Sequence, residues 1–113
     1  MKLLVLVLNK EEYLDDILEA FVEVGITGAT ILDSVGMGHK LAYEVPIFAG
    51  LRKSIKTSDY NKTIFSVVQE DDILEEAVKL IGQIINFDET GTCLLFVVPL
   101  LMVKGLIKNE LIW

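Results

Sequence analysis

The sequence predicts an α+β fold: a ferredoxin-like βαββαβ sandwich in which two helices cover one face of a four-stranded antiparallel sheet. The first observation behind this prediction is a strand–helix–strand pattern that occurs twice in 113 residues, over 2–34 and again over 63–99. The second is the stretch 35–62 between the copies, which is too long for an ordinary connection and therefore a candidate functional loop. We expect one domain over residues 1–113.

The first copy consists of a strand over 2–8, a helix over 11–24 and a strand over 28–34. An apolar stripe at helical spacing, opposite an acidic face, predicts the helix. Asn9, followed three residues later by a glutamate, has the pattern of a capping box, and Gly25 is suited to the C-terminal cap. The stripe consists of Leu14, Ile17, Leu18, Phe21 and Val22.

The second copy consists of strands over 63–68 and 92–99 with a helix over 71–85 between them. The same apolar spacing predicts this helix, and either aspartate of the pair at 71–72 is a suitable N-cap. Gly82 within the helix costs about 1 kcal/mol relative to alanine. We therefore expect Gly82 to pack tightly against a strand.

The predicted strands suggest that more than one copy of the chain assembles. Residues 3–8 and 94–98 are apolar at every position, so apolar side chains should project from both faces of the sheet. Two helices can cover only one face, and each large side chain left exposed forgoes about 1.5–3 kcal/mol. We expect six to eight such side chains and a homo-oligomer that covers them. The alternative is that the apolar tail, 100–113, folds back over this face.

The long excursion has the composition of a partner-binding loop. Pro46 is suited to the first turn of a short helix over part of 46–56, where apolar residues recur at helical spacing beside basic ones. This pattern favours contact with an acidic protein partner, although basic residues can also simply keep an apolar helix in solution. The predicted contact residues are Phe48, Leu51, Arg52 and Lys53.

Composition excludes several classes of protein. A net charge of −7 gives no basic surface for nucleic acid. The apolar runs 3–8 and 94–103 are too short to cross a membrane, so we expect a soluble cytoplasmic protein. Cys93 is the single cysteine and is expected to be a buried, inert thiol. No hydrolytic triad or redox motif is present, so we expect no enzymatic activity and no catalytic residue.

Four segments resemble PII-type nitrogen-regulatory signalling proteins. Residues 17–31 resemble their first helix and second strand, and 67–72 the entry to their second helix. Gly36-Met37-Gly38 resembles the opening of their T-loop, and 90–99 their B-loop and last strand. The match covers 1–104, and its most specific piece is the run Glu-Val-Gly-Ile-Thr-Gly.

The resemblance implies a compact homotrimer with its sheets facing inward. It also implies a sensing function, in which an adenine nucleotide such as ATP or ADP binds in clefts between subunits. The T-loop, here 35–62, would then contact a target enzyme, transporter or regulator. The candidate cleft residues that this carries over are Gly36, Gly38, His39, Lys62, Gly91, Thr92 and Lys104.

The chain departs from the family where phosphates bind. His39 replaces an arginine, Cys93 and Leu94 replace a glycine and a lysine, and Lys104 stands alone where the family has two arginines. Each charged hydrogen bond contributes about 1.5–3 kcal/mol, so these losses predict weak triphosphate binding. An adenosine-type ligand with less charge is compatible with what remains. The tyrosine that some members modify has no aligned counterpart.

Other interpretations remain open on the sequence. Gly36 and Gly38 either expose backbone amides to an anion or supply positive φ at a strand exit. His39 contacts a ligand or is simply a surface loop residue. The chain could also be a divergent trimer of the PII or cation-tolerance type that binds metal or is purely structural, although no partner at metal-ligand spacing accompanies His39. A sensing module of the ACT type shares the topology.

Overall fold

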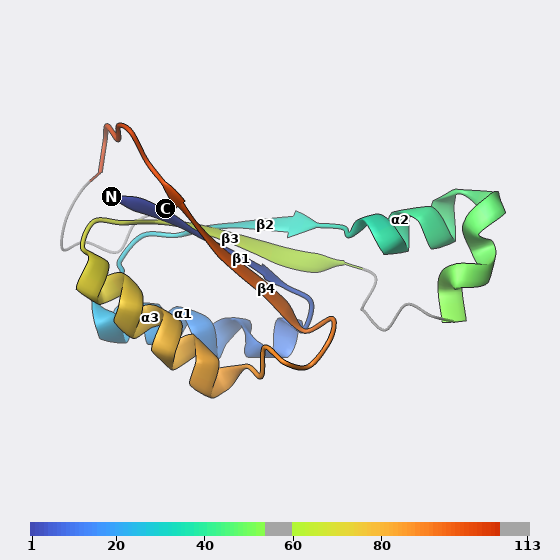
Figure 1. Ribbon diagram of the computed structural model, residues 1–113, viewed down its shortest axis with the longest axis horizontal. Helices are drawn as coiled ribbons and strands as arrows, with labels where there is room; N and C mark the ends of the chain where they lie inside the picture. Colours follow the sequence, from blue (N-terminus) through green and yellow to red (C-terminus); the bar gives the residue numbers. More distant parts are fainter. Residues whose placement is uncertain (54–59, 107–113) are drawn as a thin grey trace.

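The computed structural model describes residues 1–53 and 60–106 and has the predicted α+β architecture. All strand pairs are antiparallel, in the order β2-β3-β1-β4, and α1 and α3 lie together on one face of the sheet (Figure 1). This is the ferredoxin-like arrangement. The elements are β1 (Lys2–Leu8), η1 (Glu11–Tyr13), α1 (Leu14–Val24), β2 (Thr30–Ser34), α2 (Met37–Glu44), η2 (Pro46–Lys53), β3 (Asn61–Val68), α3 (Asp71–Ile84) and β4 (Cys93–Pro99).

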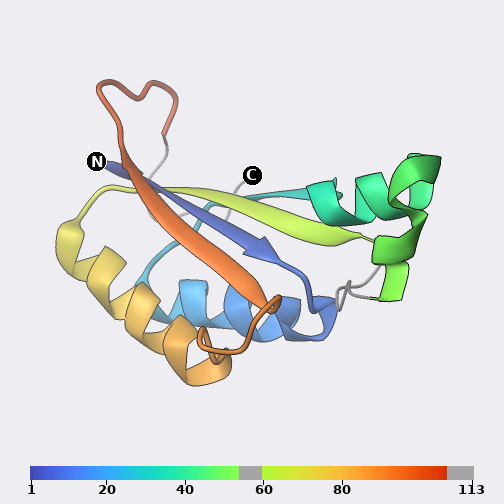
Figure 2. The same ribbon diagram turned by 45° about the vertical axis from the view of Figure 1, so that its right-hand side comes forward.

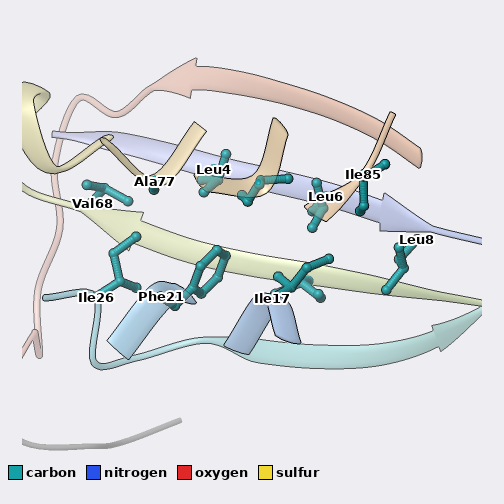
Figure 3. Close-up of a cluster of buried hydrophobic side chains, with 11 residues drawn as sticks. Leu4, Leu6, Leu8, Ile17, Phe21, Ile26, Val68, Ala77 and Ile85 are labelled. Atoms are coloured by element: carbon teal, nitrogen blue, oxygen red, sulfur yellow. The ribbon is translucent and has the colours of Figure 1, made fainter. Parts of the chain in front are cut away.

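The hydrophobic core lies between the sheet and the two helices (Figure 3). Alternate residues of β1 point to the same face, which places its leucines 4, 6 and 8 against α1 and α3. The helices contribute stripe positions such as Ile17 and Ile81, but the prediction is wrong for Val22, which is 53% exposed on α1. The core side chains are Leu4, Leu6, Leu8, Ile17, Phe21, Ile26, Ile64, Val68, Ala77, Ile81 and Ile85.

The N-terminal caps of both helices differ from the prediction, whereas the C-terminal cap of α1 agrees with it. Gly25 caps α1 with a φ of 97°, as expected for a left-handed C-cap. The capping box is wrong, because a 3-10 turn precedes α1 and neither helix start has a side-chain cap hydrogen bond. The side chain of Asn9 bonds to distant residues instead. The N-cap of α3 is Glu70, without a side-chain bond, and not an aspartate.

Gly82 does not pack closely against a strand, contrary to the prediction. It is exposed on α3, and a Cβ built at this position would meet nothing within 4 Å. Gly82→Ala is therefore expected to stabilise the fold by about 0.5–1 kcal/mol. Alanine lowers the conformational entropy of the unfolded chain, and its Cβ clashes with no atom in the folded state. Urea denaturation measures this change.

The matched control for this prediction is Gly25→Ala. Gly25 has a φ of 97°, so an alanine there costs about 1–2 kcal/mol. A destabilising effect of Gly82→Ala would mean that something contacts this part of α3 in solution.

The second face of the sheet is only partly covered. Leu94, Phe96 and Val98 alternate along β4 and are 59%, 43% and 38% exposed. Leu32 on β2 is 48% exposed on the same face. The exposed set is smaller than the predicted six to eight, because the tail from Val103 to residue 106 lies over part of the face. Tail residues 107–113 lie outside the described residues.

The excursion forms a pair of packed helical segments beyond the end of the sheet. In Figures 1 and 2, α2 and η2 lie side by side and project away from the body of the domain. We refer to α2 and η2 together as the hairpin. Ala42 is fully buried between them. Pro46 begins η2, as predicted, although the segment is a 3-10 helix, and α2 was not predicted. Positions 54–56 of the predicted helical stretch lie outside the described residues.

Candidate functional site

The base of the hairpin and the turn before β4 meet at one end of the sheet. Gly36 is the N-cap of α2, and Gly91 and Thr92 directly precede β4. Lys62 pairs with Leu8 of β1, and Leu8 also pairs with the first residue of β4. The order of the strands therefore brings these candidate residues, far apart in sequence, to the same edge.

Two glycines at this edge have different backbone conformations. Gly91 has a φ of 81°, a conformation that other residues rarely adopt. Gly36 has a φ of −77°, and Gly38 lies within α2. The interpretation that Gly36 and Gly38 supply positive φ is therefore wrong. Both belong to the first turn of a helix.

Lys62 is engaged by carboxylates of its own chain. Its ammonium group bonds to Asp33, its cross-strand neighbour on β2, and lies 3.7 Å from a carboxylate oxygen of Glu11. The hydrogen bond to Asp33, together with the nearby negative charges, raises the pKa of Lys62 above its ordinary value. Lys62 therefore carries a charge that is already compensated within the protein.

An aromatic cluster connects the two parts of the hairpin. The ring of His39 stacks on Tyr43 with centroids 4.6 Å apart, and Tyr60 is tilted against it at 6.1 Å. The guanidinium of Arg52 lies 4.9 Å above the Tyr43 ring, and its Nε donates to the Ala42 carbonyl at 2.9 Å. Arg52, predicted as a partner contact, thus also holds η2 to α2.

The other predicted partner contacts lie on η2. Phe48 and Leu51 are 40% and 41% exposed, and Ile47 beside them is 82% exposed. Lys53 ends η2, and its side chain lies outside what the structure describes. The hairpin therefore presents apolar side chains on a helical support.

Thr92 is the most enclosed of the candidate residues. It is 2% exposed, and its backbone carbonyl accepts a hydrogen bond of 3.0 Å from the Asn9 amide. Its Oγ1 has no hydrogen-bond partner within the described part of the chain. Buried hydroxyls are normally hydrogen-bonded, so the unpaired Oγ1 of Thr92 is an unusual feature of this edge.

A row of polar side chains, which we call the relay, crosses this edge and was not predicted. The Oγ1 of Thr63 lies 2.7 Å from the Oγ of Ser34, which bonds to the Oδ1 of Asn61. The Nδ2 of Asn61 donates to the Oδ1 of Asn9 at 3.0 Å, and the Nδ2 of Asn9 donates to the Gly91 carbonyl at 2.8 Å. The sequence signal was a polar residue at the end of each neighbouring strand.

Lys104 does not join the other candidates within one chain. It lines a pocket of 190 Å³ with residues from the opposite ends of the strands, among them Leu3, Thr30 and Val67. Leu3 is the second residue of β1, whereas Asn9 follows the end of that strand. The length of the sheet therefore separates Lys104 from Gly91.

Cys93 is half-buried at the start of β4, and burial raises the pKa of its thiol to about 11. At pH 8 the reactive thiolate is therefore about 100-fold scarcer than for a free cysteine. Alkylation by iodoacetamide is expected to be slower by at least this factor and to accelerate only as the pH approaches 11. The measurement is modification rate against pH, compared with the urea-unfolded protein. A rate that levels off near pH 8 would contradict it.

Two further properties concern only the part of the chain that the structure describes. No group of three or more His, Cys, Asp or Glu residues there could hold a metal ion. None of the helices there has the length and apolar character needed to cross a membrane.

The fold and the projecting hairpin define a class of small α+β domain in which a long loop leaves a ferredoxin-like core. A family model described as "Nitrogen regulatory protein P-II" matches residues 1–110. The chain belongs to the P-II family, which indicates a regulatory, signal-transducing role. No curated protein matches the sequence.

Proposed function

We propose that the chain is the subunit of a homotrimeric P-II sensor. It binds a small effector, an adenine nucleotide such as ATP or ADP, in clefts between subunits, and contacts a protein target through the loop at 35–62. The observation that carries this proposal is the meeting of the hairpin base with the Gly91–Thr92 turn at one sheet edge. An effector bound at that edge would contact both the Gly91–Thr92 turn and the loop to which a target would bind.

The exposed part of the second sheet face supports the trimer. Leu94, Phe96 and Val98 form an exposed apolar row on β4. Burying such side chains between copies is favourable by about 1.5–3 kcal/mol each. A second copy would also supply what a single chain lacks at the cleft, since Lys104 lies a strand length from Gly91.

The charges at the edge favour an effector with few phosphates. Lys62 is already paired with Asp33 and Glu11, and the two positions after Thr92 are Cys93 and Leu94. To form an ion pair with the Lys62 ammonium group, a triphosphate would have to displace a carboxylate from it. Backbone amides of the Gly91 turn can still bind a single phosphate or a ribose hydroxyl.

Calorimetric titration with ATP, ADP, AMP and cyclic AMP tests this proposal. At least one adenine ligand is expected to bind, and removal of the γ-phosphate is expected to cost no affinity. Lys104→Ala should weaken binding, whereas Lys79→Ala, at an exposed position on α3, should not. No heat from any of the four ligands, with an intact trimer, would overturn the nucleotide part of the proposal.

The hairpin supports the target contact. Three apolar side chains are exposed together on η2, namely Ile47, Phe48 and Leu51. The contacts of Arg52 with α2 fix the position of η2, which carries them. Preorganised apolar surface of this kind lowers the ordering cost of binding. The proposed contacts remain Phe48, Leu51, Arg52 and Lys53.

A further inference from the structure

The side-chain hydrogen bonds of the relay share one direction along the sheet edge. The Ser34 hydroxyl lies against two acceptors of Asn61, the Oδ1 and, at 3.2 Å, the backbone carbonyl. With its single proton directed toward either of them, Thr63 is the donor across the 2.7 Å contact with Ser34. Asn61 then donates to Asn9, and Asn9 donates to the Gly91 carbonyl. Each group thus accepts from one neighbour and donates to the next, an order in which successive hydrogen bonds polarise and strengthen one another.

One end of the relay lies at the base of the hairpin. Ser34 ends β2, two residues before Gly36, the N-cap of α2. A Cβ at Gly36 would stand 3.9 Å from the Nδ2 of Asn61, so the side chain of Asn61 lies directly against this point of the backbone. Asn61 is 7% exposed. A displacement of the hairpin base therefore meets a buried amide that is bonded on both sides, to Ser34 and to Asn9.

The other end of the relay holds one peptide group. Asn9 bonds the Gly91 carbonyl through its side chain at 2.8 Å and the Thr92 carbonyl through its backbone amide at 3.0 Å. The carbonyl and N–H of a trans peptide point in opposite directions. Holding the Gly91 oxygen toward Asn9 therefore fixes the Thr92 N–H away from it. Gly91, at a φ of 81°, has the conformational freedom to turn if this hold is lost.

We propose that Asn9 and Asn61 are positioning residues that couple the base of the hairpin to the orientation of the Gly91–Thr92 peptide. The role of this coupling in sensing rests on the proposed function. The relay connects the turn that would bind the effector to the loop that would contact the target. A change at either end alters the donor direction at the other.

Amide NMR of the effector-free protein tests the coupling from the end of the relay at Ser34. Ser34→Ala removes one hydroxyl whose partners are Asn61 and Thr63. The amide signals of Gly91 and Thr92 are nevertheless expected to shift. Hydrogen exchange of the Asn9 amide, which bonds the Thr92 carbonyl at 3.0 Å, is expected to become about tenfold faster, as for one lost hydrogen bond of ordinary strength. Ser34→Thr restores the hydroxyl and should return the signals toward wild type. Shifts confined to the neighbours of residue 34 overturn the proposal.

Asn9→Asp tests the coupling from the opposite end. The aspartate can still accept from Asn61 but can no longer donate to the Gly91 carbonyl. Exchange of the Lys40 amide, which bonds the Gly36 carbonyl at 3.0 Å, is expected to accelerate about tenfold. The matched control is Asn86→Asp, because the Oδ1 of Asn86 accepts from the Asp88 amide and an aspartate keeps that bond.

The test separates this inference from the proposed function. Equal exchange of Lys40 in Asn9→Asp and Asn86→Asp overturns the coupling, whether or not nucleotides bind. Coupled amide shifts in a protein that binds none of the adenine ligands leave the relay standing and overturn only the choice of effector.

Discussion

Leu6→Ala is expected to lower the free energy of unfolding by about 2–5 kcal/mol, as large-to-small substitutions in a packed core do. Leu6 is 0% exposed at the centre of β1, between both neighbouring strands and beneath the helices. Its removal leaves a cavity bordered by the neighbouring strands and the helices, so the site has little freedom to collapse. A loss of this size is a large part of the about 5–15 kcal/mol that holds an ordinary domain folded.

Urea denaturation at a fixed protein concentration measures the effect, since association would make the midpoint depend on concentration. Ile47→Ala is the matched control. Ile47 is 82% exposed on the hairpin, and its truncation should stay within about 0.5 kcal/mol of wild type. Equal losses in the two variants would contradict the placement of Leu6 in the core.

The body of the fold was predictable because its signals are local and repeated. The apolar stripes of α1 and α3 bury most of the positions they predict, among them Ile17, Phe21 and Ile81, although Val22 is 53% exposed. The strands follow from apolar runs, and the antiparallel order from two copies of one pattern. The stripes depend on neighbours three or four residues apart and the strands on contiguous apolar runs, and a sequence displays both directly.

Helix α2 was missed because little of its stability is local. Its glycine-containing sequence has a weak apolar pattern, and Ala42 is its only buried residue. The helix is held by η2, through the Arg52 contacts with Tyr43 and the Ala42 carbonyl. Such contacts depend on how the chain turns back, which periodicity does not reveal.

The candidate site was only half predictable for the same reason. The glycines of the two loops could be found through family resemblance, but the relay depends on strand register. Asn61 pairs with Ser34 across β2 and β3, and its side chain meets Asn9 beyond the end of β1. Asn9 was predicted to cap a helix. It bonds across the sheet instead, because the register places better partners within reach.

Phe96→Glu is expected to abolish assembly while leaving the chain folded. Phe96 is 43% exposed on the free face of β4, so a glutamate there can reach water in a single copy. Between copies the same carboxylate would be buried without a partner, at a cost of several kcal/mol. In a closed trimer each subunit carries this cost, so the penalty is counted once per copy.

Light scattering should show a particle near the chain mass of 12.6 kDa for Phe96→Glu and about three times that mass for the unaltered protein. Phe87→Glu is the control, since Phe87 is 41% exposed but lies in the turn after α3, away from the sheet. It should leave the mass unchanged. A folded Phe96→Glu variant that keeps the larger mass would place the contact between subunits elsewhere and would remove the physical reason for a cleft that borrows Lys104 from a neighbour.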